Sequence, residues 1–190
     1  MCFRLHSSVP VNAVCRLYDI YTDYFRKDIW CRMKTGAEWA TEAFKDDIYA
    51  TEVTGIAIEE ASENHAVLSV QLESKHRNAM NQVQGGVMFT LADFSFAIAS
   101  GYKRPITVTL SAEIKYMSRM NGDKLIAEAV CLKDGRSTCF YGIDIRDELG
   151  TPVAYVTATG YRFRAHAESE FPAEQLDNPY REQVCFQKKS

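Results

Sequence analysis

Apolar and polar residues alternate in several segments of the chain, and this period of two residues predicts β-strands. Apolar and polar residues alternate without a break from Ile106 to Tyr116, and a shorter alternation runs from Ala66 to Leu72. Turn sequences separate the segments that follow, so we expect the last four strands to form an antiparallel meander. The six expected strands span residues 53–59, 66–72, 106–116, 124–133, 137–146 and 153–164.

One long apolar segment, QGGVMFTLADFSFAIASG (84–101), lies between the two groups of strands. Its residues 86–100 are too many for one typical strand and suit a helix of about four turns. Apolar residues fall on nearly all faces of this helix, which is typical of a buried helix. A shorter helix is expected over 38–49. The pattern therefore predicts an α+β chain with the hotdog fold, a curled antiparallel sheet wrapped around one long central helix.

The chain has 190 residues, enough for one domain with terminal extensions. We expect an N-terminal extension without catalytic residues over 1–34, the hotdog domain over 35–164 and a polar C-terminal tail over 165–190. The net charge of -3 gives no sign of a nucleic-acid surface. No run approaches the length of a membrane span, and the N-terminus lacks the apolar core of a signal peptide, so we expect a cytoplasmic protein.

The six cysteines and four histidines show no metal-ligand spacing, so no metal site is expected. Cys131 and Cys139 flank the turn sequence Asp134-Gly135. A two-residue turn would place the two thiols on opposite faces of the sheet, which argues against a disulfide between them.

A single carboxylate interrupts the long apolar segment. Asp93 is the only charged residue from Gln84 to Tyr102. A desolvated, unpaired charge is very costly, so this carboxylate must be solvated, paired or used. It could cap a neighbouring backbone, or it could be catalytic.

The surrounding motif favours catalysis. The run HRNAMNQVQGGVMFTLADFSFAIAS (76–100) closely resembles the core motif of hotdog-fold acyl-CoA thioesterases of the phenylacetate-pathway (PaaI-like) type, and the similarity covers about 47–164. The most specific feature is the spacing: Asn78, then Gly85-Gly86 seven residues later, then Asp93 at the end of LAD. The family motif usually reads HGG, and Gln84 stands here in place of the histidine.

The resemblance implies hydrolysis of the thioester of a small or medium acyl-CoA, aryl or short-chain, without a cofactor beyond the coenzyme A of the substrate. Two glycines at the start of a helix allow an acyl group to approach the backbone. The N–H of Gly85 or Gly86 would be an unpaired donor at the positive end of the helix dipole, and would stabilise the oxyanion. Asp93, poorly solvated among apolar residues, would be the nucleophile or the general base.

The same resemblance implies that Asn78 is catalytic together with Gly85 and Asp93, and it assigns Gln84, Gly86, Thr109 and Ser111 to substrate binding. Asn78 would hold the thioester or the water, and Thr109 or the nearby Ser111 would orient the water. Gln84 and Gly86 would contact the substrate at the helix entrance. Each has a structural alternative: Asn78 could be a loop or N-cap residue, the glycines could permit tight packing, and the two hydroxyls could belong to a polar strand face.

Gln84 can donate a hydrogen bond but cannot act as an acid or base near neutral pH. We infer a positional role for it, with activity retained. The alternative function is a non-catalytic module that binds acyl-CoA or another acyl thioester. A hotdog dehydratase would need a histidine in the helix region, and none occurs between His76 and His166.

The two ends of the expected site are far apart in one helix. Gly85 and Asp93 are separated by about 12 Å along the helix axis at about 1.5 Å per residue. We therefore expect a homodimer whose active sites take the glycine end from one chain and the carboxylate from the other. The resemblance agrees, and implies homotetramers as well. No nucleic acid or membrane is expected as a partner.

Overall fold

The computed structural model describes residues 35–104 and 107–162 of the chain. The expected N-terminal extension (1–34) and C-terminal tail (165–190) lie outside these residues. The described elements, in chain order, are α2 (Gly36–Ala43), η1 (Tyr49–Val53), β1 (Ile56–Ser62), β2 (His65–Gln71), η2 (Ser74–His76), α3 (Gly85–Gly101), β3 (Thr107–Tyr116), β4 (Lys124–Asp134), β5 (Thr138–Asp147) and β6 (Pro152–Arg162).

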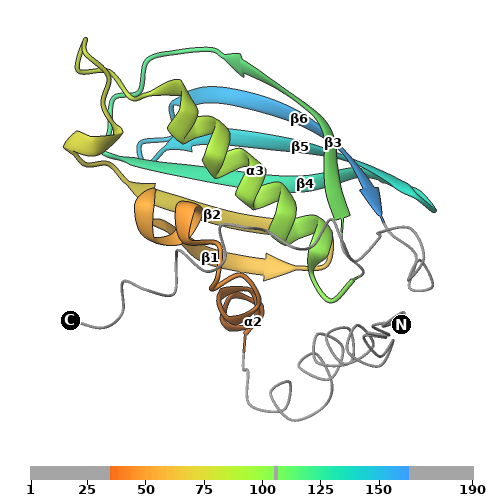
Figure 1. Ribbon diagram of the computed structural model, residues 1–190. Coiled ribbons are helices and arrows are strands. Elements are labelled where there is room, and N and C mark those ends of the chain that lie inside the picture. Colours follow the sequence, from red (N-terminus) through yellow and green to blue (C-terminus); the bar gives the residue numbers. More distant parts are fainter. Residues whose placement is uncertain (1–34, 105–106, 163–190) are drawn as a thin grey trace, which may run out of the picture. The chain divides into compact units, whose positions relative to one another are not determined.

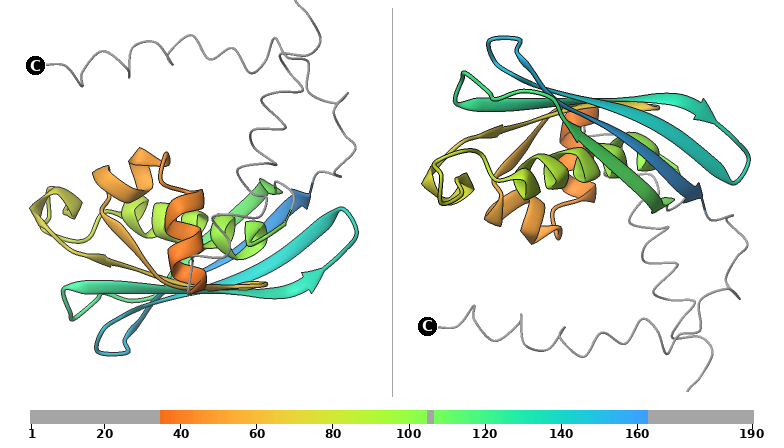
Figure 2. Two further views of the ribbon diagram at one scale, coloured as in Figure 1. Left: turned by 90° about the horizontal axis from the view of Figure 1, so that it is seen from below. Right: turned by 90° about the horizontal axis from the view of Figure 1, so that it is seen from above.

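The strands form one antiparallel sheet in the order β1-β2-β4-β5-β6-β3. The sheet curls around α3, which lies against its concave side (Figure 1). Figure 2 shows the same two layers from below and from above. The predicted α+β hotdog architecture is therefore confirmed. The helix expected over 38–49 is divided into α2 and the separate π-helical turn η1.

The position of β3 differs from the expected meander. Strands β4, β5 and β6 do follow one another as antiparallel neighbours, but β3 pairs with β6 at the far edge of the sheet and not with β4. Alternation along a segment predicts a strand but carries no information about its neighbours. The chain that leaves the end of α3 therefore enters an edge position, and residues 117–123 return it to β4.

The central helix is not buried on all sides. Nine of its residues are buried, among them Leu91 and Phe96. Gly86, Phe89 and Asp93 are exposed, and their spacing of three and four residues places them on one face. The sequence-based expectation of a helix buried all round is wrong for this face, because the sheet and α2 cover only the other sides.

A β-bulge changes which side chains of β3 face the helix. Thr109 pairs with Gly160, but the pairing shifts by one residue between Thr109 and Ser111. A shift of one residue reverses the face to which the following side chains point. Thr109 therefore lies on the helix side, whereas Ser111 lies on the outer face. The expectation that both hydroxyls share one polar face is wrong.

A second bulge corrects the expectation for the cysteines. It lies between Cys131 and Lys133 in β4, and the hairpin to β5 has three residues outside the strands, not two. Cys131 now pairs with Tyr141, whose ring contacts Phe96 of α3 at 5.3 Å between centroids. Cys139 lies two residues before Tyr141 and is buried on the same side. Both thiols are free, and they share the helix side of the sheet.

Aromatic contacts hold α2 against the C-terminal half of α3. The helix begins with a capping box between Thr35 and Glu38. Trp39, which is buried, packs edge-on against Tyr102 with 4.8 Å between ring centroids. Phe44, at the end of α2, contacts Phe94 of α3 at 5.8 Å. Through these contacts α2 covers a side of α3 other than its exposed face.

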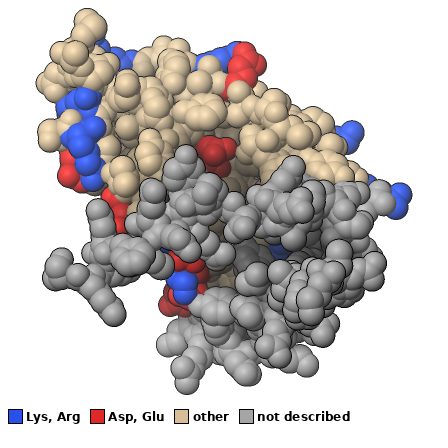
Figure 3. Space-filling model, viewed as in Figure 1, with Lys and Arg blue, Asp and Glu red and all other residues tan. Residues whose placement is uncertain are grey.

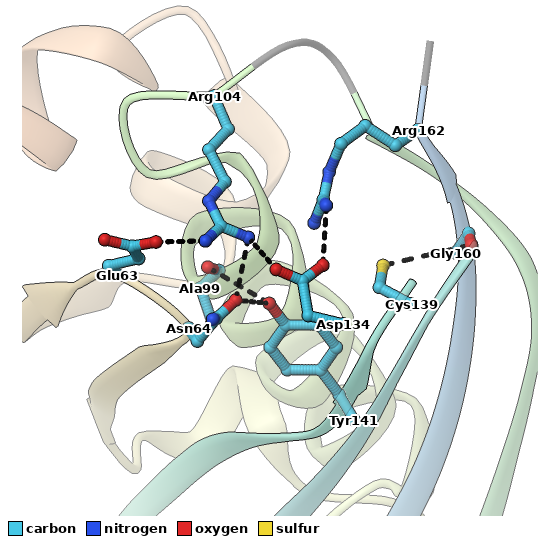
Figure 4. Close-up of polar contacts among 9 residues, drawn as sticks. All are labelled: Glu63, Asn64, Ala99, Arg104, Asp134, Cys139, Tyr141, Gly160 and Arg162. Carbon is cyan, nitrogen blue, oxygen red and sulfur yellow. Dashed lines mark hydrogen bonds and ion pairs between the residues drawn. The ribbon is translucent and has the colours of Figure 1, made fainter. Parts of the chain in front are cut away.

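Four charged side chains form a cluster of ion pairs near the C-terminal end of α3: Glu63, Arg104, Asp134 and Arg162 (Figure 4). Arg104, which follows α3, binds Asp134 of the β4–β5 hairpin at 2.6 Å and also pairs with Glu63 of the β1–β2 turn. Arg162, at the end of β6, binds the other carboxylate oxygen of Asp134 at 2.6 Å. Asp134 thus links segments that lie far apart in the sequence.

Candidate active site

The first turn of α3 presents free backbone donors. The Gln84 N–H donates to the oxygen of His76 at 2.8 Å, and the Gln84 oxygen accepts from the Val87 N–H at 2.9 Å. Between them, the N–H groups of Gly85 and Gly86 have no acceptor among the described residues, as expected at a helix N-terminus. The exposed Gln84 side chain makes no capping hydrogen bond to the helix. The donors can therefore meet an anion or a carbonyl oxygen.

Asn78 shapes the loop that leads into α3. Its Oδ1 accepts hydrogen bonds from the N–H groups of Met80 at 2.9 Å and Gln82 at 3.1 Å. The alternative that Asn78 is a structural loop residue is therefore correct for this oxygen, because both of its hydrogen bonds are made within the loop. Its Nδ2 has no hydrogen-bond partner among the described residues. A contact between Asn78 and the substrate, made through Nδ2, stays a prediction.

The start of this loop is anchored by a buried histidine. His76 Nδ1 accepts from the Glu73 N–H at 2.9 Å, so its Nε2 donates to the oxygen of Thr54 at 2.9 Å. The histidine is 3% exposed and both ring nitrogens are bonded to backbone. His76 therefore positions the loop and is not available for proton transfer.

Asp93 lies on the exposed face of α3, where its Oδ1 accepts a hydrogen bond from Thr109 Oγ1 at 3.2 Å. On the face that carries α3, Figure 3 shows an isolated acidic patch whose described neighbours are neither acidic nor basic. The structure thus brings Asp93 and Thr109 together, whereas Ser111 lies on the other face of β3. In the single chain the carboxylate is solvated, contrary to the expectation of a poorly solvated group.

The two halves of the site do not meet within one chain. One uninterrupted helix contains both Gly85 and Asp93, so about 12 Å of helix axis separates the free N–H groups from the carboxylate. A single thioester group cannot contact both, because each contact needs a distance of about 3 Å.

Tyr116 is a neighbour of the site that sequence reasoning missed. Its hydroxyl donates to the Gly85 oxygen at 3.1 Å, and the side chain is 56% exposed. A Cβ atom on Gly85 would lie 2.7 Å from this hydroxyl oxygen, so the contact requires glycine at that position. The contact joins residues that are 31 apart in sequence. The one signal for Tyr116 in the sequence was that it is the last apolar residue of the alternating segment that predicts β3.

The described residues contain no cluster of three or more His, Cys, Asp or Glu side chains that could hold a metal ion. Within the same part of the chain, no helix has the length and apolar character needed to cross a membrane.

Known sequences resemble this chain over the region that contains the candidate site. The family model of the thioesterase superfamily matches residues 80–154, which include Gly85 and Asp93. A protein of Archaeoglobus fulgidus named "Putative esterase" is 31% identical over 126 residues, which cover 64% of this chain and 82% of that protein. The "Acyl-coenzyme A thioesterase PaaI" of Escherichia coli is 28% identical over 109 residues, which cover 57% of this chain and 78% of that protein.

Solved structures show the same fold. The structure of Escherichia coli PaaI superposes with a TM-score of 0.63 at 25% identity, covering 68% of this chain and 94% of that one. A hypothetical thioesterase of Streptococcus pneumoniae, solved with coenzyme A, superposes with a TM-score of 0.57 at 28% identity. That match covers 64% of this chain and 97% of the other.

Proposed function

This chain belongs to the thioesterase superfamily, and on that premise we propose that it hydrolyses the thioester bond of a small or medium acyl-CoA, aryl or short-chain. The observation that carries the proposal is the exposed face of α3. It presents two free backbone N–H groups at its start and one carboxylate, held by a threonine hydroxyl, in its middle. The coenzyme A bound to the Streptococcus pneumoniae relative supports a substrate of this class.

The reaction uses the two halves of the site in opposite roles. The free N–H groups of the first turn would bind the thioester oxygen and stabilise the negative charge that develops on it. As a general base, Asp93 would take a proton from a water molecule while that water attacks the carbonyl carbon. The carbon–sulfur bond then breaks, and the coenzyme A thiolate leaves and is protonated. As a nucleophile, Asp93 would form an anhydride that water hydrolyses.

Thr109 would keep the carboxylate oriented in either mechanism. Its hydroxyl donates to Oδ1 of Asp93 and leaves Oδ2 for the water or the substrate. Ser111 has no such contact, because the bulge in β3 turns it away. Of the two hydroxyls considered from the sequence, we therefore assign the orienting role to Thr109.

We propose that the site is completed by a second copy of the chain. Because Gly85 and Asp93 lie too far apart along one α3 helix, a complete site needs the carboxylate of one helix and the glycine end of another. Two antiparallel α3 helices related by a two-fold axis would supply both. β3 is an edge strand with exposed Val108 and Leu110, and Phe89 is exposed on α3. A dimer that covers these residues would also remove water from around Asp93. A homotetramer of such dimers is the further assembly that the resemblance implies.

Subunit mixing tests the shared site. Chains with Asp93→Asn are expected to be inactive because they lack the proposed base or nucleophile. Chains with Gly85→Pro are also expected to be inactive, because proline removes the Gly85 N–H and its ring would collide with Tyr116. After dissociation and reassociation, each hybrid dimer has one intact site of two. With half of the dimers hybrid, activity should recover to about a quarter of that of wild type treated alike.

The hybrids must be verified by differently sized tags on the two chains. Wild-type chains taken through the same procedure control for losses during reassociation. Verified hybrids that remain inactive, while wild type recovers, would show that each site belongs to one chain.

Gln84→His is expected to be tolerated and to retain at least half of wild-type kcat. The side chain is exposed and makes no hydrogen bond to the helix, so exchanging it removes no described contact. It restores the residue usual in the family, and a histidine N–H can make the same positional hydrogen bond. Rates measured over several acyl chain lengths would check this. Complete loss of activity would give Gln84 a role specific to this protein.

A panel of acyl-CoA thioesters, followed by release of free thiol, tests the proposed function itself. Aryl and short-chain substrates should be hydrolysed faster than long-chain ones. The alternative, an acyl-CoA-binding module, is motivated by Gln84 in place of the family histidine. It would give saturable binding of acyl-CoA in calorimetry without thiol release, and that result would replace the proposed function.

A further inference from the structure

We propose that Tyr116 is a positioning residue for the oxyanion donor at the start of α3, an inference that rests on the proposed thioesterase function. The hydroxyl of Tyr116 donates to the Gly85 oxygen at 3.1 Å. That oxygen belongs to the peptide group that joins Gly85 to Gly86. The other end of the same group is the Gly86 N–H, one of the two free donors at the helix entrance.

The contact controls the donor because a peptide group is planar. Holding the oxygen of the group in place also sets the direction of its N–H. A hydrogen bond to the oxygen polarises the amide and strengthens the N–H as a donor. Tyr116 therefore acts on the oxyanion through Gly86, without touching the substrate itself.

The local packing shows that this contact is specific to a glycine. A Cβ atom at position 85 would lie 2.7 Å from the Tyr116 hydroxyl oxygen and 3.0 Å from the ring carbon that carries it. A Cβ atom at position 86 would meet nothing closer than 3.9 Å. The two glycines therefore differ in role. The absence of a side chain at position 85 leaves room for the Tyr116 hydroxyl, and position 86 supplies the free N–H.

The bulge in β3 is what allows one strand to serve both ends of the site. Thr109 and Tyr116 are seven residues apart, and in a regular strand residues seven apart point to opposite faces. The one-residue shift after Thr109 places both on the helix side, opposite Gly160 and the buried Ala154 respectively. One hydroxyl then reaches Asp93, and the other reaches the Gly85 oxygen.

Kinetics of Tyr116→Phe test the role of the hydroxyl. The ring stays, so packing is retained, and we expect kcat to fall about 3- to 10-fold, less than the about 100-fold loss of a whole oxyanion donor. KM should stay within about twofold, because the change acts on the transition state. Tyr116→Leu should add little to this loss if the hydroxyl is the active part. Tyr155→Phe is the matched control, since Tyr155 pairs with Asp144 on the outer face.

A merely structural role predicts the opposite pattern, in which Tyr116→Phe matches wild type and only Tyr116→Leu is impaired. That pattern would overturn the inference. A double-mutant cycle adds a second criterion: Gly85→Ala displaces the hydroxyl, so its loss in kcat should be smaller in the Tyr116→Phe background. Strictly additive losses would also contradict the proposal.

The Gly86 amide gives a readout that does not depend on activity. The chain has ten glycines, so selective ¹⁵N-glycine labelling gives a simple spectrum, in which Gly86→Ala identifies the Gly86 signal by its loss. Tyr116→Phe should shift this amide resonance, whereas Tyr155→Phe should not. An unmoved Gly86 resonance would overturn the inference. An inactive wild type would instead overturn the proposed function, while the Gly86 shift would still report whether Tyr116 acts on this peptide.

Discussion

Asp93→Asn is expected to lower kcat by about 100-fold or more on whichever acyl-CoA the wild type hydrolyses best, because general-base contributions are about 100- to 10,000-fold. The amide is nearly the same size as the carboxylate, but it can neither accept the proton of the attacking water nor attack the carbonyl carbon. It can still accept the Thr109 hydrogen bond through its oxygen. Substrate binding should therefore change much less than kcat.

The stability of this variant should stay close to that of wild type, because Asp93 is exposed and its described contact is one neutral hydroxyl. Asp144→Asn is a matched control: Asp144 is an exposed aspartate on the outer face of β5. Thiol release and thermal unfolding of both variants separate a chemical effect from a folding effect. If Asp93→Asn retains more than half of wild-type activity, Asp93 is not the catalytic group.

Asp134→Asn is expected to destabilise the fold by about 2 kcal/mol or more. Arg104 and Arg162 are only 17% and 12% exposed, and Asp134 is the carboxylate that they share. Removing one partner of a buried ion pair costs about 3–5 kcal/mol, because the other charge is left uncompensated. The expected cost is smaller here because Asp134 is 30% exposed and Arg104 keeps its contact with Glu63. Chemical denaturation of the two proteins measures the difference.

The exposed pair Lys115–Glu113 gives the control for this experiment. Its nitrogen and oxygen lie 3.5 Å apart and both side chains are more than half exposed. Exposed pairs contribute about 0–1 kcal/mol, so Glu113→Gln should leave the midpoint of unfolding almost unchanged. Equal effects of the two substitutions would show that the cluster at the end of α3 adds no particular stability.

The effect of Asp134 should depend on pH. Desolvation raises the pKa of this carboxyl, but Arg162 and Arg104 outweigh it, and the pKa is lowered from its ordinary value of 3.8. The stabilisation is therefore fully present above about pH 4, where the unfolded state is also ionised, and is lost as the pH falls below that value. The difference in the free energy of unfolding between wild type and Asp134→Asn should shrink in the same range.

The residue pattern was sufficient for the six strands and the central helix, and it singled out the chemical groups of the candidate site. Alternation identified the strands, because a half-buried strand repeats at every second residue whatever its neighbours are. The apolar segment with Asp93 and the glycine pair identified the central helix and the two places on it to which we assign the proposed chemistry, because length and spacing are local properties. The fold class follows from these elements in their chain order, although the strand order within the sheet does not.

Which of these groups meet was decided only by the tertiary structure. The bulge after Thr109 brings this hydroxyl to Asp93 and turns Ser111 away, yet nothing in the alternating residues of β3 marks the place of the extra residue. The edge position of β3 and the exposed face of α3 likewise depend on pairing between distant segments. Tyr116 reaches Gly85 across 31 residues for the same reason: a strand's periodicity is set by adjacent residues, whereas its register and partners are set by the packing of the whole sheet.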